Sequence, residues 1–173
     1  GGFYMGNKYK FGIVGCGDIA THHADSIEAV ENAELTAVCD IVEEAAEKFA
    51  GDYNLDTYYT DYNDLVNDDN VDVVSVCTAS GFHGEISIAA AEAGKHIICE
   101  KPIAITKEDL NDMEKVITKN GIKMQCVFQS RLKQPYLQVK EAVDEGELGR
   151  LILNDVYLKF YRSQEYYDKA DWK

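Results

Sequence analysis

Hydrophobic positions along the chain fall into short continuous runs that alternate with longer amphipathic segments. Short β-branched runs bounded by glycine or polar residues are typical of strands buried on both faces of a sheet. The longer segments have the periodicity of helices that cover such a sheet. Six strands are expected in all, and ranges are predicted for five of them, over residues 10–14, 34–39, 71–77, 96–99 and 123–128. The helices are predicted over 19–30, 43–53, 61–67, 84–93, 106–120 and 135–145.

Residues at the predicted helix ends agree with this pattern. Asp61 and Thr106 stand where an N-cap side chain is needed. Gly94 follows the alanine-rich helix, and Gly121 follows the next one, as C-terminal stop signals.

The alternation of strand and helix predicts the fold class. The connections are too long for hairpins, so we expect an α/β protein with six parallel strands in a Rossmann-type doubly wound sheet. After residue 128 the pattern changes, and residues 151–161 alternate in the manner of an antiparallel strand with one covered face. We expect a dinucleotide-binding domain over residues 8–128 and the beginning of a second domain over 129–173.

Charge and cysteine content exclude several classes of protein. The 17 basic and 31 acidic residues give a net charge of −14, which argues against a nucleic-acid surface. The five cysteines show no CxxC spacing, no set of His, Asp or Glu has metal-ligand spacing, and no apolar run is long enough to span a membrane. We expect a cytoplasmic protein with reduced thiols, and with no metal, nucleic-acid or membrane partner.

A glycine motif follows the first strand. Gly15 permits a tight turn, Gly17 lets a pyrophosphate approach the backbone, and Ala20 allows the next helix to pack closely on the strand. The N–H groups at the start of that helix then face the phosphates. This context predicts a dinucleotide-binding turn.

Asp40 ends the second strand, about twenty residues after the glycines. Its carboxylate accepts hydrogen bonds from a ribose 2′-hydroxyl and repels a 2′-phosphate. No arginine lies nearby in the sequence, so we expect NAD rather than NADP.

A second group of polar residues follows the later strands, at the sheet edge where such folds bind ligands. Thr78 follows the strand over 71–77, and Glu100, Lys101 and Pro102 follow the strand over 96–99. A lysine there can hydrogen-bond a substrate hydroxyl and stabilise the oxygen that becomes a carbonyl as hydride leaves. We expect an ion pair between Glu100 and Lys101.

The four histidines are less informative. His83, near the start of a helix, is more often structural than functional when it is taken alone. His22 and His23 lie on the first helix just after the glycine turn, where a side chain can approach a ligand, and His96 begins a strand. We expect structural roles for these three.

From residue 10 onward the chain resembles the Gfo/Idh/MocA family of oxidoreductases. The resemblance rests on three segments and two shorter ones. They are Gly12-Ile13-Val14-Gly15-Cys16-Gly17-Asp18-Ile19-Ala20, Val76-Cys77-Thr78 with His83, Ala93 through Ala104 with its Glu100-Lys101-Pro102, Phe128-Gln129-Ser130-Arg131, and Gly146-Glu147-Leu148-Gly149.

The resemblance implies that the second domain is an α/β domain built on an open antiparallel sheet, which commonly forms the interface of a homo-oligomer, a dimer or tetramer. It implies hydride transfer between NAD(P) and a sugar or cyclitol carbon, with Lys101 contacting nicotinamide and substrate and with Gln129 and Arg131 near the active site. The family's acid/base histidine has no matching segment here. We therefore expect the chain to be an N-terminal portion that is poorly active alone.

Residues 162–172 more loosely resemble the branch that acts on nucleotide-linked sugars, including UDP-N-acetyl-hexosamine and uronate 3-dehydrogenases. We expect a small sugar or nucleotide-sugar substrate that contacts Lys101, Arg131, Tyr161 and Arg162, and Lys101 is the predicted catalytic residue. The predicted cofactor-binding residues are Gly15, Cys16, Gly17, Asp18, Ile19, Asp40, Ile41, Cys77, Thr78, Ala79, His83, Glu100, Lys101 and Gln129.

Two other functions stay open from the sequence. A Rossmann fold also serves as a non-catalytic NAD-binding regulatory module. An NADP-linked activity of the biliverdin-reductase or dihydrodiol-dehydrogenase kind shares the fold, although Asp40 speaks against it.

Overall fold

A parallel six-stranded sheet forms the centre of the first of two compact units, which ends at Val127. The computed structural model describes residues 8–168. The strands follow the order β3-β2-β1-β4-β5-β6, and every neighbouring pair is parallel. Their bounds are β1 Tyr9–Val14, β2 Ala33–Cys39, β3 Tyr58–Tyr59, β4 Val73–Val76, β5 His96–Cys99 and β6 Met124–Cys126. This confirms the predicted doubly wound Rossmann-type sheet.

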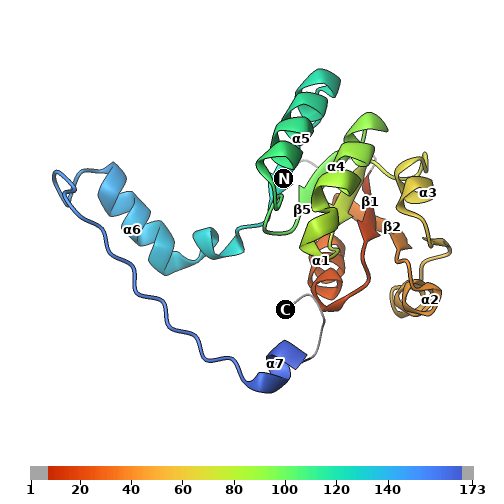
Figure 1. The fold of residues 1–173 in the computed structure, drawn as a ribbon, viewed down its shortest axis with the longest axis horizontal. Coiled ribbons are helices and arrows are strands. Elements are labelled where there is room, and N and C mark those ends of the chain that lie inside the picture. The colour runs from red at the N-terminus through yellow and green to blue at the C-terminus, as the bar shows by residue number, and fades with distance from the viewer. Residues whose placement is uncertain (1–7, 169–173) are drawn as a thin grey trace. The chain divides into compact units, whose positions relative to one another are not determined.

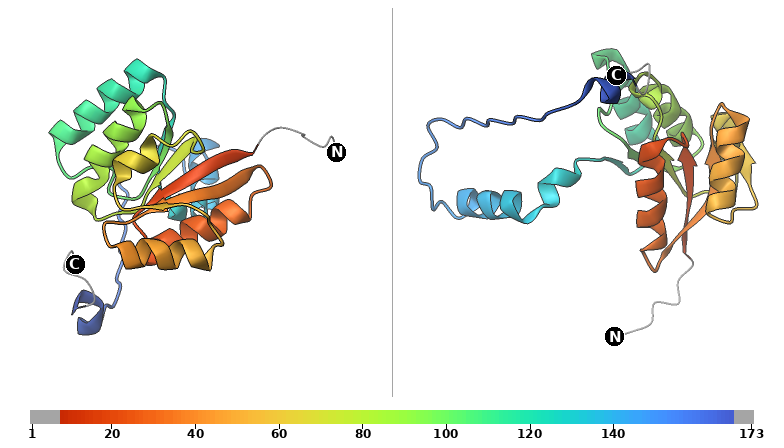
Figure 2. Two further views of the ribbon diagram at one scale, coloured as in Figure 1. Left: turned by 90° about the vertical axis from the view of Figure 1, so that its right-hand side faces the viewer. Right: turned by 90° about the horizontal axis from the view of Figure 1, so that it is seen from below.

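Helices cover both faces of the sheet (Figure 1 and Figure 2, left). On one face lie α1 (Asp18–Glu28) and α2 (Glu43–Asp52), and on the other lie α3 (Tyr62–Val66), α4 (His83–Glu92) and α5 (Lys107–Asn120). Successive residues of a strand point to opposite faces, so Ile13 packs in the core under α1 and α2, and Val14 packs in the core under α3, α4 and α5. Burial on both faces explains the nearly continuous apolar runs of the central strands.

Strand β3 is the one strand whose range the sequence pattern did not give. It has only two residues and pairs only with β2, at the edge of the sheet. Two residues are too few to show any hydrophobic periodicity, because that pattern needs several positions.

The predicted helix caps are present. The Asp61 side chain accepts a hydrogen bond from the Asn63 N–H, and Thr106 Oγ1 accepts one from the Asp109 N–H at 3.0 Å. Gly121 adopts a left-handed conformation, with φ of 67°, at the end of α5. These local signals fix where the helices begin and end.

The chain divides into two compact units between Val127 and Phe128. The described part of the second unit contains η2 (Gln129–Leu132), α6 (Gln134–Asp144) and α7 (Gln164–Asp168). The strand predicted over residues 151–161 is wrong for this structure, because these residues form neither strand nor helix. A strand needs a neighbour for its backbone hydrogen bonds, and residues 128–168 contain no strand to pair with it. Residues 169–173 of the expected second domain lie outside the described residues. They include the last four residues, 169–172, of the segment 162–172.

Candidate functional site

The order of the strands reverses between β1 and β4. Val14 at the end of β1 pairs with Cys39 of β2 on one side and with Val76 of β4 on the other. The chain leaves β1 toward α1 on one face and leaves β4 toward α4 on the other. In open parallel sheets, ligands bind at the carboxyl ends of the strands at such a reversal.

Gly15 turns the chain away from β1 at this point. Its φ is +94°, and its N–H donates a hydrogen bond to the Cys39 carbonyl at 2.8 Å. A Cβ atom on Gly15 would lie 2.8 Å from the carbonyl carbon and oxygen of Cys77. Only glycine fits here, because both the conformation and the close backbone approach exclude a side chain.

Gly17 is different, because it faces open space. It is the N-cap of α1, with φ of −81°, and nothing lies within 4 Å of the position where a Cβ atom would be. No side chain caps α1, and the Ala20 N–H donates to the Gly17 carbonyl at 2.9 Å, which leaves the N–H groups of Asp18 and Ile19 without a partner among residues 8–168. This turn, with Cys16, Asp18 and Ile19 around Gly17, presents an open helix N-terminus to an anion.

Asp40 fastens the glycine turn to the end of β2. Its Oδ2 accepts a hydrogen bond from the Cys16 N–H at 2.8 Å, and its Oδ1 accepts one from the Val42 N–H at 2.9 Å. Each carboxylate oxygen keeps a second lone pair, so the half-buried group retains acceptor capacity for a hydroxyl. Ile41 beside it is 87% exposed at the same edge of the sheet.

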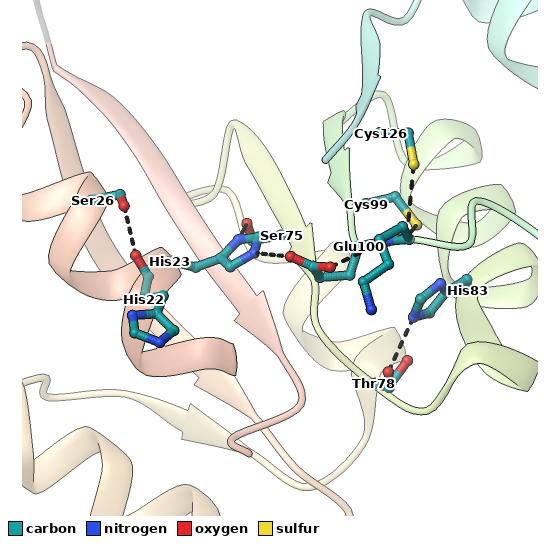
Figure 3. Close-up of polar contacts among 10 residues, drawn as sticks. His22, His23, Ser26, Ser75, Thr78, His83, Cys99, Glu100 and Cys126 are labelled. Carbon is teal, nitrogen blue, oxygen red and sulfur yellow. Dashed lines mark hydrogen bonds and ion pairs between the residues drawn. The ribbon is translucent and has the colours of Figure 1, made fainter. Parts of the chain in front are cut away.

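The segment after β4 contains Cys77, Thr78 and Ala79 and leads through η1 (Ser80–Phe82) to His83. The His83 side chain is buried. Its Nδ1 lies 2.7 Å from the Pro102 carbonyl oxygen. Its Nε2 lies 3.0 Å from the Thr78 carbonyl oxygen (Figure 3). The ring therefore joins the loops after β4 and β5 and directs both nitrogens at backbone oxygens.

Lys101 lies on the turn that follows β5. Its side chain is exposed, and its peptide bond to Pro102 is cis. The predicted Glu100–Lys101 ion pair is wrong for the described structure. Glu100 is only 5% exposed, and its Oε1 lies 3.2 Å from Nε2 of His23 instead. Consecutive residues at a strand end point in opposite directions, so Glu100 turns inward while Lys101 faces outward.

His23 is the residue that sequence reasoning missed. Its Nδ1 lies 2.8 Å from Oγ of Ser75 in β4, so the imidazole stands between Ser75 and Glu100 (Figure 3). The missed signal is its position in α1, because His23 shares a helix face with the buried residues Ala20 and Ile27, whereas His22 is exposed.

The other predicted site residues belong to the second unit. Gln129 and Arg131 lie in η2, and Tyr161 and Arg162 lie in the segment before α7. The Arg162 guanidinium is stacked 5.7 Å from the centre of the Phe160 ring. Roles for these four residues stay predictions.

The five cysteines are free thiols, and they gather at the carboxyl edge of the sheet. Burial, with a smaller contribution from Asp40, raises the pKa of Cys39 to about 12. Burial also raises the pKa of Cys99 to about 12. Few thiolates therefore exist near neutral pH, and a nucleophilic role for these sulfurs is unfavourable.

We expect Cys39 and Cys99 to react with a disulfide reagent at about pH 8 roughly a thousandfold more slowly in the folded protein than in guanidinium chloride. The reason is the smaller thiolate fraction when the pKa is raised from 9.0 to about 12. The absorbance of the thiol released from the reagent, followed over time in the two solvents, measures this ratio. Equal rates in both solvents for all five thiols would contradict it.

A cavity of about 760 Å³ lies at the opposite edge of the sheet, near the amino ends of β1 and β5. Two of its three lysines are engaged within the fold: Lys10 Nζ donates to Asn70, and Lys95 Nζ donates to the carbonyls of Asp68 and Val71. Within residues 8–168, no group of three or more His, Cys, Asp or Glu side chains is placed to hold a metal ion. No described helix is long and apolar enough to cross a membrane.

Comparison with known proteins agrees with this geometry. The family described as "Oxidoreductase family, NAD-binding Rossmann fold" matches residues 9–128. An inositol 2-dehydrogenase/D-chiro-inositol 3-dehydrogenase of Lactiplantibacillus plantarum is 40% identical over 165 residues, which is 93% of this chain and 47% of that protein. The chain thus spans about half the length of the curated relatives it matches.

Solved structures show the same similarity. The WlbA dehydrogenase of Bordetella pertussis, in complex with NADH and UDP-GlcNAcA, has a TM-score of 0.88 and 32% identity, covering 96% of this chain and 51% of that one. A scyllo-inositol dehydrogenase of Lactobacillus casei with bound NAD(H) and scyllo-inositol has a TM-score of 0.78 and 30% identity, covering 83% and 43%. The glycine turn, the Lys101 turn and these matches show that the chain belongs to the Gfo/Idh/MocA oxidoreductase family.

Proposed function

We propose that the full-length protein containing this chain is an NAD-dependent oxidoreductase. It transfers hydride between nicotinamide and a hydroxyl-bearing carbon of a sugar, cyclitol or nucleotide sugar. The observation that carries the proposal is the exposed Lys101 at the end of β5, on the same sheet edge as the open N-terminus of α1 at Gly17.

The residues at this edge fit a dinucleotide. The open space at Gly17 and the N–H groups of α1 suit the pyrophosphate, and the remaining lone pairs of Asp40 suit a ribose hydroxyl. When bound, NAD supplies the ring that accepts or delivers the hydride. Thr78 lines the same edge, after β4.

Lys101 is the catalytic residue of this proposal. Its ammonium group donates a hydrogen bond to the substrate oxygen and stabilises the negative charge that develops on that oxygen as the carbon loses hydride. The exposed position of the side chain allows this contact without displacing a partner, since no hydrogen bond or ion pair to Nζ occurs among residues 8–168.

Substrate oxidation by the full-length protein tests the proposal. NADH formation would be followed with myo-inositol, scyllo-inositol and UDP-GlcNAcA in separate reactions, and NADP would replace NAD in a parallel series. NADH formation with any of the three supports the proposal. NAD binding without turnover would favour a regulatory module, and turnover with NADP alone would favour the NADP-linked alternative.

Asp40→Ala is expected to weaken NAD binding by about 1–2 kcal/mol, the magnitude of a charge-assisted hydrogen bond. It is also expected to reduce the preference for NAD over NADP, because the carboxylate that repels a 2′-phosphate is gone. Calorimetric titration of the full-length protein measures both affinities.

Asp56→Ala is the matched control for this variant, because Asp56 is an exposed aspartate outside the candidate site. Asp40 also holds the N–H groups of Cys16 and Val42, so the melting temperature of each variant must be recorded. Unchanged NAD and NADP affinities in a folded Asp40→Ala protein would remove Asp40 from the cofactor site.

We also propose the domain boundaries and the assembly. Residues 8–128 would form the dinucleotide-binding domain, and 129–173 would begin the substrate and oligomerisation domain. Gln129 is proposed to contact the cofactor, and Arg131, Tyr161 and Arg162 are proposed to contact the substrate. The full-length protein is also proposed to act in the cytoplasm as a homo-oligomer.

A further inference from the structure

We propose that His23 and Glu100 form a positioning pair that holds the Lys101 turn against the helix at the cofactor phosphates. His23 belongs to α1, which begins at the glycine turn, and Glu100 immediately precedes Lys101. The inference deepens the proposed function and rests on it, because it concerns where Lys101 stands during hydride transfer.

The side chains form a continuous chain of polar contacts. Nε2 of His23 lies 3.2 Å from Oε1 of Glu100, and Nδ1 lies 2.8 Å from Oγ of Ser75. The other carboxylate oxygen of Glu100, Oε2, accepts a hydrogen bond from the Lys101 N–H at 3.1 Å. The Glu100 carboxylate therefore connects the imidazole of α1 to the backbone of the lysine turn.

Burial makes these contacts consequential. Ser75 is 1% exposed and Glu100 is 5% exposed, so neither group can exchange its partner for bulk water. A buried carboxylate that loses its partner is strongly destabilised where it stands. Without His23, Glu100 would have to move toward solvent, and the Lys101 N–H would lose its acceptor.

The backbone of Glu100 is held by hydrogen bonds as well, so only its side chain can change orientation. Its N–H donates to the Val76 carbonyl at 3.0 Å, and its carbonyl accepts from the Cys99 thiol at 3.3 Å. The strand end is thus fixed to β4, while the orientation of the turn beyond it depends on Oε2. We infer that His23 acts through Glu100 and touches neither cofactor nor substrate.

Three variants of the full-length protein test the pair. His23→Leu removes both polar contacts of the imidazole. His23→Gln keeps them in principle, since its amide N–H can donate to Glu100 and its carbonyl can accept from the Ser75 hydroxyl. His22→Ala is the control, because His22 neighbours His23 on α1 but has an exposed side chain.

We expect His23→Leu to lower kcat by about 10–100-fold, the cost of a catalytic group displaced by about 1 Å, with the NAD Kd changed by less than about threefold. His23→Gln should recover kcat to within about threefold of the unmodified enzyme. The kcat of His22→Ala should equal that of the unmodified enzyme. A folded His23→Leu protein with unchanged kcat would overturn the proposal. The proposal would also be overturned if His23→Gln lost as much kcat and as much melting temperature as His23→Leu, because that result indicates a purely structural role.

A second measurement does not depend on turnover. The Lys101 amide proton is held by Glu100, so His23→Leu should speed its exchange in nuclear magnetic resonance by at least about tenfold and leave the amides of β4 and β5 unchanged. Unchanged exchange at Lys101 would overturn the pair even if the enzyme is active. If the unmodified protein oxidises no substrate, the proposed function fails, while the exchange result still decides whether His23 holds the turn.

Discussion

Replacing Lys101 with alanine is expected to lower kcat of the full-length protein by at least about 100-fold. The ammonium group is the exposed cation that follows β5 at the candidate site, and its loss leaves the developing charge on the substrate oxygen without a hydrogen-bond donor. The NAD Kd is expected to change by less than about threefold, because the pyrophosphate and ribose contacts lie on other strands.

Initial rates and NAD titrations on the same preparation separate these two effects. Lys119→Ala is the control, because Lys119 is an exposed lysine in the last turn of α5. Turnover of Lys101→Ala near that of the unmodified protein would contradict the catalytic assignment. An equal loss of NAD affinity and of turnover would instead make Lys101 a cofactor-binding residue.

Gly17→Ala is expected to weaken NAD binding by about 10–100-fold while the protein folds normally, the effect of one lost hydrogen bond to a charged phosphate. Gly17 has a φ of −81°, which alanine adopts freely, and no protein atom would contact the added Cβ. The methyl group would fill the open space through which a pyrophosphate reaches the N–H groups of α1.

Gly15→Ala serves as the comparison, because its main expected effect is on folding stability. Its φ of +94° and its 2.8 Å approach to the Cys77 backbone should cost at least about 2 kcal/mol of folding stability. Gly51→Ala, in the last turn of α2 with nothing within 4 Å, should stabilise the protein by about 0.5–1 kcal/mol. Denaturant unfolding measures the folding stability of the Gly15→Ala, Gly17→Ala and Gly51→Ala proteins. A Gly17→Ala protein that binds NAD normally would place the pyrophosphate elsewhere.

The fold was predictable because its signals are local. The apolar runs gave five of the six strands, and the side chains of Asp61 and Thr106 cap the helices that follow them. The glycine turn was also predictable, because the tight turn at Gly15 and the open position of Gly17 follow from their spacing after a strand.

The polar pairing at the site was not predictable from adjacency in sequence. Glu100 and Lys101 are neighbours, so an ion pair between them was expected, yet the carboxylate points inward to His23, 77 residues earlier in the chain. Such a contact depends on how α1 packs on the sheet, which brings the His23 side chain to Ser75 of β4 and to Glu100 after β5, and no local pattern encodes this. The histidine on the apolar face of α1 was the available signal.

The predicted strand over 151–161 failed for a related reason. Its alternating apolar residues, Val156 and Leu158 among them, are exposed in this structure. An alternating pattern describes a strand with one covered face, but backbone pairing is non-local, and no strand in residues 128–168 supplies it.

Calorimetric titration of the full-length protein with NAD, and separately with NADP, tests most directly whether the carboxyl edge at β1 and β4 is the cofactor site. We expect NAD to bind in preference to NADP, with a heat signal that Gly17→Ala suppresses and Gly51→Ala leaves unchanged. Absence of binding to either dinucleotide, or NAD binding that Gly17→Ala does not weaken, would contradict the site and with it the proposed oxidoreductase activity.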